Sequence, residues 1–338
     1  MENSIQNWKV LVADNSALMC RLIKKYLVEM GLKVENITLA GDGNQAAMMT
    51  DLMSFDLVTA GRHMRSKDGL ELLKGIRANP DDSVNKVKFL VISADGSPQL
   101  VADILSAGAN GLLNKPFHPQ DLSETISRLT NGNSGFVCLK DSERCSQKIE
   151  YLKEASFSAE ESVKGVPQEL IDVFVQSTVE GLGQYMVQAQ PGSRCDDAKV
   201  KGDLASSIDL TDPKFGMKFV LTLLFPKKGA CTIYETLFGE VDMEMVCGIV
   251  GELNNIIGGA VKPYLTGMAK TCHDLIPSDS VSVEDVSELE LQLGFPESKW
   301  LAEDELGLPE GEGVRFSVPF QLDEGQLYLS VALQPIES

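Results

Sequence analysis

The stretch "FDLVTAGRHMRSKDGLELL", residues 55–73, joins a buried strand to a helix through a turn that should carry a reactive side chain. The apolar run at 57–60 predicts the strand, and "DGLELLKGIRA" predicts the helix that follows. In parallel sheets the chemistry sits at the carboxyl ends of the strands. At that position this chain has Gly61, which has no side chain. The sequence therefore predicts a site whose central residue is missing.

The pattern around this stretch alternates between strand and helix from residue 9 to about residue 130. Strands are expected in "KVLVAD", "NITLAGDG", "FDLVTA", "KVKFLVISA" and "GLLNKPF", and a helical pattern follows each of them. Five such units imply an α/β domain, a doubly wound five-stranded parallel sheet with helices on both faces. We place this domain at residues 1–130.

A second domain is expected at 166–338, after a charged, serine-bearing linker at 131–165. It opens with the helical pattern "VPQELIDVFVQSTVEGLGQYM". Strands are expected at 199–210, at 216–225 and at the start of 231–239, and a long helix follows at 243–265. An acidic segment at 277–312 is predicted to be a solvated loop. The chain then closes with two alternating strands joined by "DEG", which predicts a hairpin in an α+β domain.

Composition narrows the class of protein. The chain has 30 Lys and Arg residues and 49 Asp and Glu residues. Residues 1–130 hold 14 of the basic and 15 of the acidic residues, so the acidic excess lies in the rest of the chain. An acidic half repels nucleic acids and anionic membranes, which favours a protein partner. Seven cysteines without a C-x-x-C motif fit a reducing cytosol. With no signal peptide or membrane-spanning run, a cytoplasmic location is expected.

Several motifs in the first 130 residues make it resemble a response-regulator receiver domain, which implies a flavodoxin-like fold. The acidic pair that ends the first receiver strand appears as Asp14 and Asn15, the switch hydroxyl as Ser93, and the lysine–proline pair as Lys115 and Pro116. "KDGLELL" follows the acceptor loop at the usual distance. Counting back from it, the phosphorylated aspartate of the family falls on Gly61.

The departures from the receiver pattern predict that this domain does not accept phosphate. Gly61 can act neither as a nucleophile nor as a magnesium ligand, and Asn15 removes a second anionic ligand. Arg65 also replaces the proline that normally follows the loop methionine. Asp14, Asn15, Gly61, Ser93 and Lys115 are then remnants of a site. Two interpretations remain open: a module for docking, dimerisation or regulation, or a mimic of one fixed signalling state.

In the second domain the informative stretch is "GIVGELNNIIGGAVKPYL", residues 248–265. Glu252 and Asn255 are three residues apart and should project from one face of a helix, whereas Asn254 points to its apolar side. The glycines nearby favour a close approach by another backbone or protein. A carboxamide can hold a water in line with phosphorus, and a carboxylate can pair with a lysine of the substrate.

Residues from about 166 to 335 resemble a CheX-type phosphatase of the CheC/CheX/FliY family, whose signature E-x-x-N is matched by Glu252 to Asn255. The resemblance implies hydrolysis of the aspartyl phosphate of CheY-type receivers. Asn255 would orient the water and Glu252 would pair with the substrate's lysine. It also implies that magnesium belongs to the substrate, that this chain holds no cofactor or metal, and that it forms a homodimer.

Two interpretations without catalysis also remain open for the second domain. Glu252 and Asn255 could be the solvated face of an amphipathic helix. The domain could also be a scaffold that binds receivers without hydrolysing their phosphate.

Overall fold

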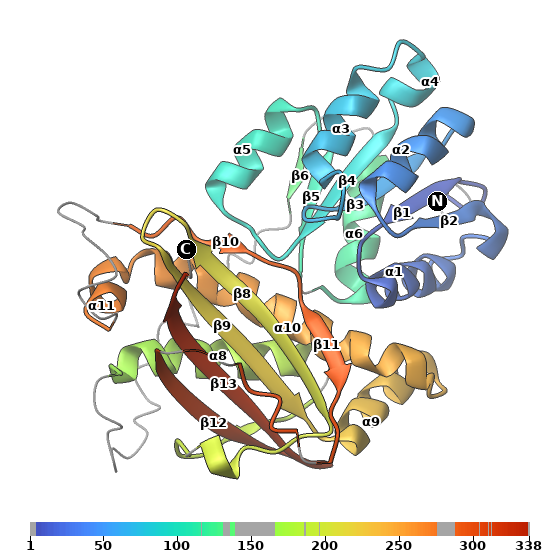
Figure 1. The fold of residues 1–338 in the computed structure, drawn as a ribbon. Coiled ribbons are helices and arrows are strands. Elements are labelled where there is room, and N and C mark those ends of the chain that lie inside the picture. The colour runs from blue at the N-terminus through green and yellow to red at the C-terminus, as the bar shows by residue number, and fades with distance from the viewer. Residues whose placement is uncertain are drawn as a thin grey trace. The chain divides into compact units, whose positions relative to one another are not determined.

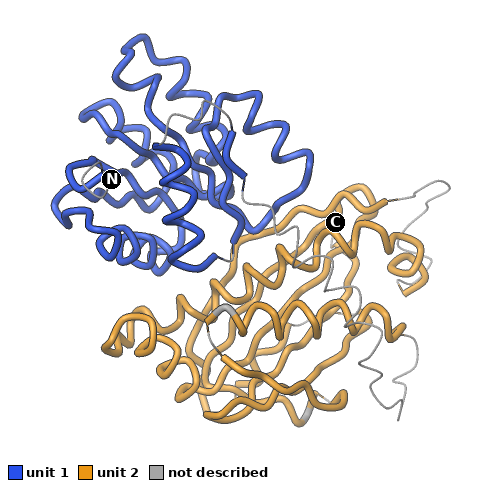
Figure 2. Tube along the Cα trace, turned by 180° about the vertical axis from the view of Figure 1, so that it is seen from behind, with its two compact units in different colours: residues 1–152 blue, residues 153–338 orange. Residues whose placement is uncertain are grey.

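The computed structural model describes residues 5–115, 117–130, 136–138, 166–185, 187–195, 197–275, 288–303, 305–309, 311 and 313–336. The chain divides into two compact units, unit 1 at residues 1–152 and unit 2 at 153–338 (Figure 2). The division falls within the segment 131–165 that the sequence analysis assigned to a linker. Most of that segment lies outside the described residues.

Unit 1 is built on a parallel sheet of six described strands in the order β2-β1-β3-β4-β5-β6 (Figure 1). The strands are β1 (Val10–Ala13), β2 (Ile37–Ala40), β3 (Leu57–Gly61), β4 (Lys88–Ser93), β5 (Gly111–Asn114) and β6 (Val137–Cys138). The five expected strands and the α/β class are confirmed. The sixth, β6, was not expected: it lies in the predicted linker and pairs in parallel with β5 through Gly111 and Val137.

Helices cover both faces of this sheet. They are α1 (Ala17–Glu29), η1 (Val34–Asn36), α2 (Gly43–Leu52), α3 (Gly69–Arg77), α4 (Asp82–Asn85), α5 (Pro98–Ser106) and α6 (Pro119–Thr130). Helices α2, α3 and α5 contribute to one apolar core with the sheet, whereas α1 and α6 contact each other. Side-chain caps fix the starts of several helices. Ser16 accepts a hydrogen bond from the backbone N–H of Met19, and Asp42 accepts from Asn44 and Gln45.

Unit 2 has a sheet of seven described strands in which all pairs are antiparallel (Figure 1). The order is β10-β8-β9-β13-β12-β7. Strand β11 also pairs with β8, at residues 204–207, whereas β10 pairs with residues 210 and 211. The strands are β7 (Gln190–Pro191), β8 (Leu204–Asp212), β9 (Met217–Phe225), β10 (Gln292–Leu293), β11 (Glu297–Trp300), β12 (Val314–Leu322) and β13 (Gly325–Pro335). The closing hairpin and the α+β class are confirmed, with Asp323 and Glu324 between the last two strands.

Unit 2 has four described α-helices and one short 3₁₀ helix, η2, whose Asp197 bonds to Arg315 and Ser317 of β12. They are α8 (Gln168–Gln184), η2 (Asp197–Lys199), α9 (Lys227–Phe238), α10 (Met243–Thr266) and α11 (Ala269–His273). The long helix α10 contacts β8 and β9 and lies beside α8. Phe174 of α8 contributes to the core under this layer, in contact with the rings of Phe219 and Phe316. Among the described residues, no helix is both long enough and apolar enough to cross a membrane.

Two expectations for unit 2 were wrong. The start of 231–239 is part of the helix α9 and not a strand, because Ala230, Ile233, Tyr234 and Leu237 recur at helical spacing and are buried together. Gly239, with a φ of 83°, ends this helix in the left-handed conformation. The segment 277–312 is not a simple loop, since it contains β10 and β11, which pair with β8.

Two glycines of α10 let the β10–β11 segment approach the helix closely. A Cβ atom added at Gly251 would lie 2.8 Å from Oγ of Ser298, and one at Gly258 would lie 2.8 Å from Cδ1 of Leu293. Real Cβ atoms essentially never come this close to another heavy atom. The expected close approach is therefore made, at least in part, by a segment of the same chain.

Gly258→Val should destabilise unit 2 by about 1–3 kcal/mol, because the added methyl groups overpack the contact with Leu293. Urea unfolding in a Trp8→Phe background would measure this, since Trp300 is then the one remaining tryptophan. Gly183→Ala in α8 is the matched control: a Cβ there meets nothing within 4 Å, so stability should rise by up to about 1 kcal/mol. Equal stability of Gly258→Val and the parent would contradict the close contact.

Candidate functional site

The receiver-like residues of unit 1 lie at the carboxyl edge of its parallel sheet. Asp14 follows β1, Gly61 is the last residue of β3, Ser93 is the last residue of β4, and Lys115 follows β5. Because β1, β3, β4 and β5 are consecutive neighbours in the sheet, these four positions meet at one end. Asn15, also at this end, is partly buried.

Asp14 and Lys115 form a buried ion pair at this edge. Nζ of Lys115 donates to Oδ2 of Asp14 at 3.0 Å, and the two side chains are 5% and 2% exposed respectively. Oδ1 of Asp14 accepts a hydrogen bond from the backbone N–H of Ser16 at 2.9 Å. A Cβ atom at Gly61 would lie 3.0 Å from Oδ2 of Asp14. The Asp14 carboxylate thus lies directly against the glycine, where this end of β3 presents no nucleophile.

The remaining features of this edge hold the backbone in place. The hydroxyl of Ser93 accepts a hydrogen bond from the N–H of Asp95, and its carbonyl accepts one from the N–H of Lys115. Asp68 caps α3 in a capping box with Glu71 and pairs with Arg62 at 2.5 Å. Burial alone would raise the pKa of Asp68, but the hydrogen bond from the Glu71 N–H and the Arg62 guanidinium hold that pKa below its usual value.

The full chain should take up no phosphate from labelled acetyl phosphate in magnesium, because Gly61 offers no carboxylate to attack phosphorus. The assay needs the Asn255→Ala variant beside the parent, so that rapid hydrolysis is not mistaken for absence of uptake. A CheY-type receiver labelled in parallel is the positive control. A hydroxylamine-sensitive label on either form of this chain would contradict the prediction.

The second candidate site lies on α10 of unit 2, where Asn254 shows which side of the helix meets the sheet. The side-chain amide of Asn254 donates to the carbonyl of Ser206 at 2.8 Å and to that of Leu221 at 3.1 Å. Each residue turns an α-helix by about 100°, so Glu252 points roughly 160° away from Asn254 and Asn255 roughly 100° away. Glu252 and Asn255 are therefore about 60° apart: Glu252 points away from the sheet, and Asn255 points to the flank of the helix.

The two residues of the pair differ in exposure. Glu252 is 2% exposed, whereas Asn255 is partly exposed. The carboxamide of Asn255 can both donate and accept hydrogen bonds, as a water-positioning group must. A lysine from another protein can reach Glu252 only if the surroundings of this carboxylate open. The sequence pattern placed the pair on one face but contained no signal for the burial of Glu252.

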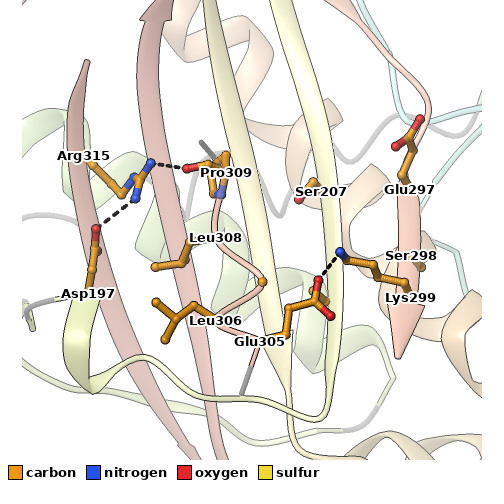
Figure 3. A pocket seen from close by; sticks show the side chains of 12 residues that line it. Asp197, Ser207, Glu297, Ser298, Lys299, Glu305, Leu306, Leu308, Pro309 and Arg315 are labelled. Atoms are coloured by element: carbon orange, nitrogen blue, oxygen red, sulfur yellow. Dashed lines mark hydrogen bonds and ion pairs between the residues drawn. The ribbon is translucent and has the colours of Figure 1, made fainter. Parts of the chain in front are cut away.

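A cleft of about 1020 Å³ lies on the opposite face of the sheet (Figure 3). Ala205 and Ser207 contribute to its lining, whereas Ser206, between them in β8, bonds to α10 on the other face. Four of its charged side chains form two ion pairs: Arg315 with Asp197 at 3.0 Å, and Lys299 with Glu305. None of the residues expected to be functional lines this cleft. The cleft was not expected from the sequence, because the segment around 305–309 was predicted to be a solvated loop.

No group of three or more His, Cys, Asp or Glu side chains that could hold a metal ion occurs in the part of the chain that the structure describes. At the receiver-like edge, Asp14 is paired with Lys115 and Asp68 with Arg62.

Solved structures of two kinds resemble the chain. The chemotaxis protein CheX from Vibrio vulnificus is 17% identical, with a TM-score of 0.38, over 49% of this chain and 99% of that protein. A CheC-like superfamily protein from Shewanella is 20% identical, with a TM-score of 0.38, over 50% of this chain and 99% of that protein. The chemotaxis response regulator CheY4 of Vibrio cholerae is 26% identical, with a TM-score of 0.34, over 36% of this chain and 98% of that protein.

Sequence comparison identifies unit 1. The model of the response regulator receiver domain matches residues 10–127. The chemotaxis protein CheY-3 of Vibrio cholerae is 32% identical over 124 residues, 37% of this chain and 92% of the relative. The CheY of Pseudomonas aeruginosa is 31% identical over 121 residues, 36% of this chain and 94% of the relative. Through residues 10–127, the chain belongs to the response regulator receiver family.

Proposed function

We propose that unit 2 hydrolyses the aspartyl phosphate of a separate CheY-type receiver, and that the receiver-like unit 1 of the same chain takes no part in the chemistry. The observation that carries the proposal is that Asn254 is bonded into the sheet, so that Glu252 and Asn255, about 60° apart on α10, both point away from the Asn254 contact. The sequence resemblance to CheX-type phosphatases supports the same assignment.

The proposed chemistry is positioning of a water molecule. The carboxamide of Asn255 holds a water in line with the phosphorus atom, and the water oxygen forms a new bond to phosphorus. The bond between phosphorus and the aspartyl oxygen breaks, the carboxylate of the substrate leaves, and the proton of the water passes to the released phosphate. Magnesium would be held by the substrate receiver, so no residue of this chain is assigned to it.

Glu252 is proposed to fix the register of the substrate by pairing with the lysine of its phosphorylation site. A charge-assisted hydrogen bond of this kind is stronger than a neutral one. Because Gly61 excludes phosphate on unit 1, the substrate must be another chain. Unit 1 would then serve in docking, dimerisation or regulation of a cytoplasmic homodimer.

The burial of Glu252 favours a second candidate function, that of a scaffold that binds receivers without catalysis. A carboxylate that is 2% exposed is not presented to a partner as the structure stands. The two candidates differ in one observable. Only the phosphatase accelerates phosphate release, whereas both bind the receiver.

Glu252→Gln should raise KM for the phosphorylated receiver about tenfold and change kcat little, because the substrate's lysine loses its ionic partner before and during the reaction. Phosphate release at varied receiver concentration measures both constants. Glu244→Gln is the matched control, since Glu244 is exposed in the first turn of the same helix and should leave both constants unchanged. An unchanged KM in Glu252→Gln would remove Glu252 from the proposed site.

A further inference from the structure

We infer that Asn254 is a positioning residue, which fixes the rotation of α10 on the sheet so that the carboxamide of Asn255 is aimed at the substrate. This inference rests on the proposed function. Asn254 is 0% exposed, and its contacts are made entirely within unit 2. It is the middle polar residue of "ELNN", between the two residues assigned to the chemistry.

The amide of Asn254 bonds to two neighbouring strands at once. It donates to the carbonyl of Ser206 in β8 at 2.8 Å and to the carbonyl of Leu221 in β9 at 3.1 Å, with Oγ of Ser206 at 3.4 Å. The amide is planar and each N–H bond has a preferred direction. Both bonds can form together only over a narrow range of helix rotation, whereas apolar contacts tolerate sliding.

The second polar atom of Asn254 shows that stability alone does not explain this residue. Its Oδ1 is buried and has no hydrogen-bond partner among the described residues. A buried acceptor without a partner is destabilising, and an apolar residue of similar size would avoid it. The amide therefore supplies a defined geometry at some expense of stability, as buried polar groups do in other helical contacts.

Helix rotation passes directly to Asn255, the next residue along the chain. A side-chain atom about 6 Å from the helix axis moves by roughly 1 Å when the helix rotates by about 10°. A misplacement of about 1 Å can slow a reaction that depends on positioning by up to about a hundredfold. Loss of the Asn254 bonds should therefore lower kcat through Asn255, although Asn254 itself does not face the substrate.

Asn254→Leu tests the inference in the full chain, with phosphorylated CheY-type receiver as substrate. We expect kcat to fall at least tenfold and KM to stay within twofold of the parent. The unfolding midpoint of unit 2, followed through Trp300 in a Trp8→Phe background, should not fall. Val250→Ala is the matched control, since Val250 lies one turn earlier and is fully buried: its midpoint should fall and its kcat stay within twofold. A parent-like kcat in Asn254→Leu would overturn the inference.

A second readout separates this inference from the proposed function. In a chain labelled with ¹⁵N at asparagine, the side-chain amide signal of Asn255 is identified by its loss in Asn255→Ala. It should shift in Asn254→Leu and stay in place in Val250→Ala. If the parent shows no phosphatase activity but the signal shifts, the proposed function fails and the positioning role stands. An unmoved signal overturns the positioning role. If Asn254→Leu does not fold, Asn254→Ser, which keeps one donor, is measured instead and should show an intermediate kcat.

Discussion

Asn255→Ala is expected to slow the release of phosphate from a phosphorylated CheY-type receiver by about a hundredfold or more at saturating receiver. The carboxamide is the group assigned to hold the attacking water, and an alanine methyl can neither donate to a water nor accept from one. Removing one preorganised hydrogen-bonding group from a catalytic site costs about 10²–10³ in kcat. KM should change little, because the substrate's lysine still pairs with Glu252.

The control for this variant is Asn15→Ala, the same chemical change at the receiver-like edge of unit 1. Asn15 takes no part in the proposed reaction, so its variant should match the parent in both constants. Binding of the phosphorylated receiver to Asn255→Ala should persist, which shows that the variant is folded. If Asn255→Ala kept half or more of the parent's kcat, the assignment of this residue would be wrong.

Lys115→Met is expected to destabilise unit 1 by about 3–5 kcal/mol, because it leaves the carboxylate of Asp14 buried without its lysine. The side chains of Lys115 and Asp14 are 5% and 2% exposed, so solvent screens the charge poorly. Urea unfolding in a Trp300→Phe background measures the effect, since Trp8 of unit 1 is then the one tryptophan.

Two further variants make this measurement specific to the buried pair. Lys86→Met removes a lysine whose ion pair with Asp82 is 71% and 72% exposed, and it should change stability by less than about 1 kcal/mol. The double variant Asp14→Leu with Lys115→Met removes both charges and should recover much of the loss. A loss of stability in Lys115→Met no larger than in Lys86→Met would show that the ion pair is not structural.

The sequence was most informative where the hydrophobic period was long and regular. Residues 88–93 and 217–225 form strands as expected, because each run consists mostly of apolar side chains that a central strand of a sheet can bury. The two-residue strand Val137–Cys138 carries no period and forms because β5 offers a free edge. The segment 231–239 has two β-branched residues near its start, Thr232 and Ile233, but the helical spacing of the buried side chains around them overrides their strand preference.

The candidate sites likewise have features that local spacing predicts and contacts that it does not. Spacing alone placed Glu252 and Asn255 on one face, and the motif order identified the glycine at the end of β3. The pairing of Asp14 with Lys115 and the bonds from Asn254 to Ser206 join residues that are 101 and 48 positions apart. Contacts at such separations depend on the packing of whole elements. The burial of Glu252 is of this kind too, and no local pattern indicates it.

The most direct test of the phosphatase assignment is multiple-turnover phosphate release from a phosphorylated CheY-type receiver in magnesium, with a catalytic amount of the full chain. We expect release to accelerate at least tenfold over the receiver's own rate, in proportion to the chain added, and to saturate with receiver. Unaccelerated release from a panel of such receivers, with binding to the chain still detectable, would contradict the assignment and leave unit 2 as a receiver-binding scaffold.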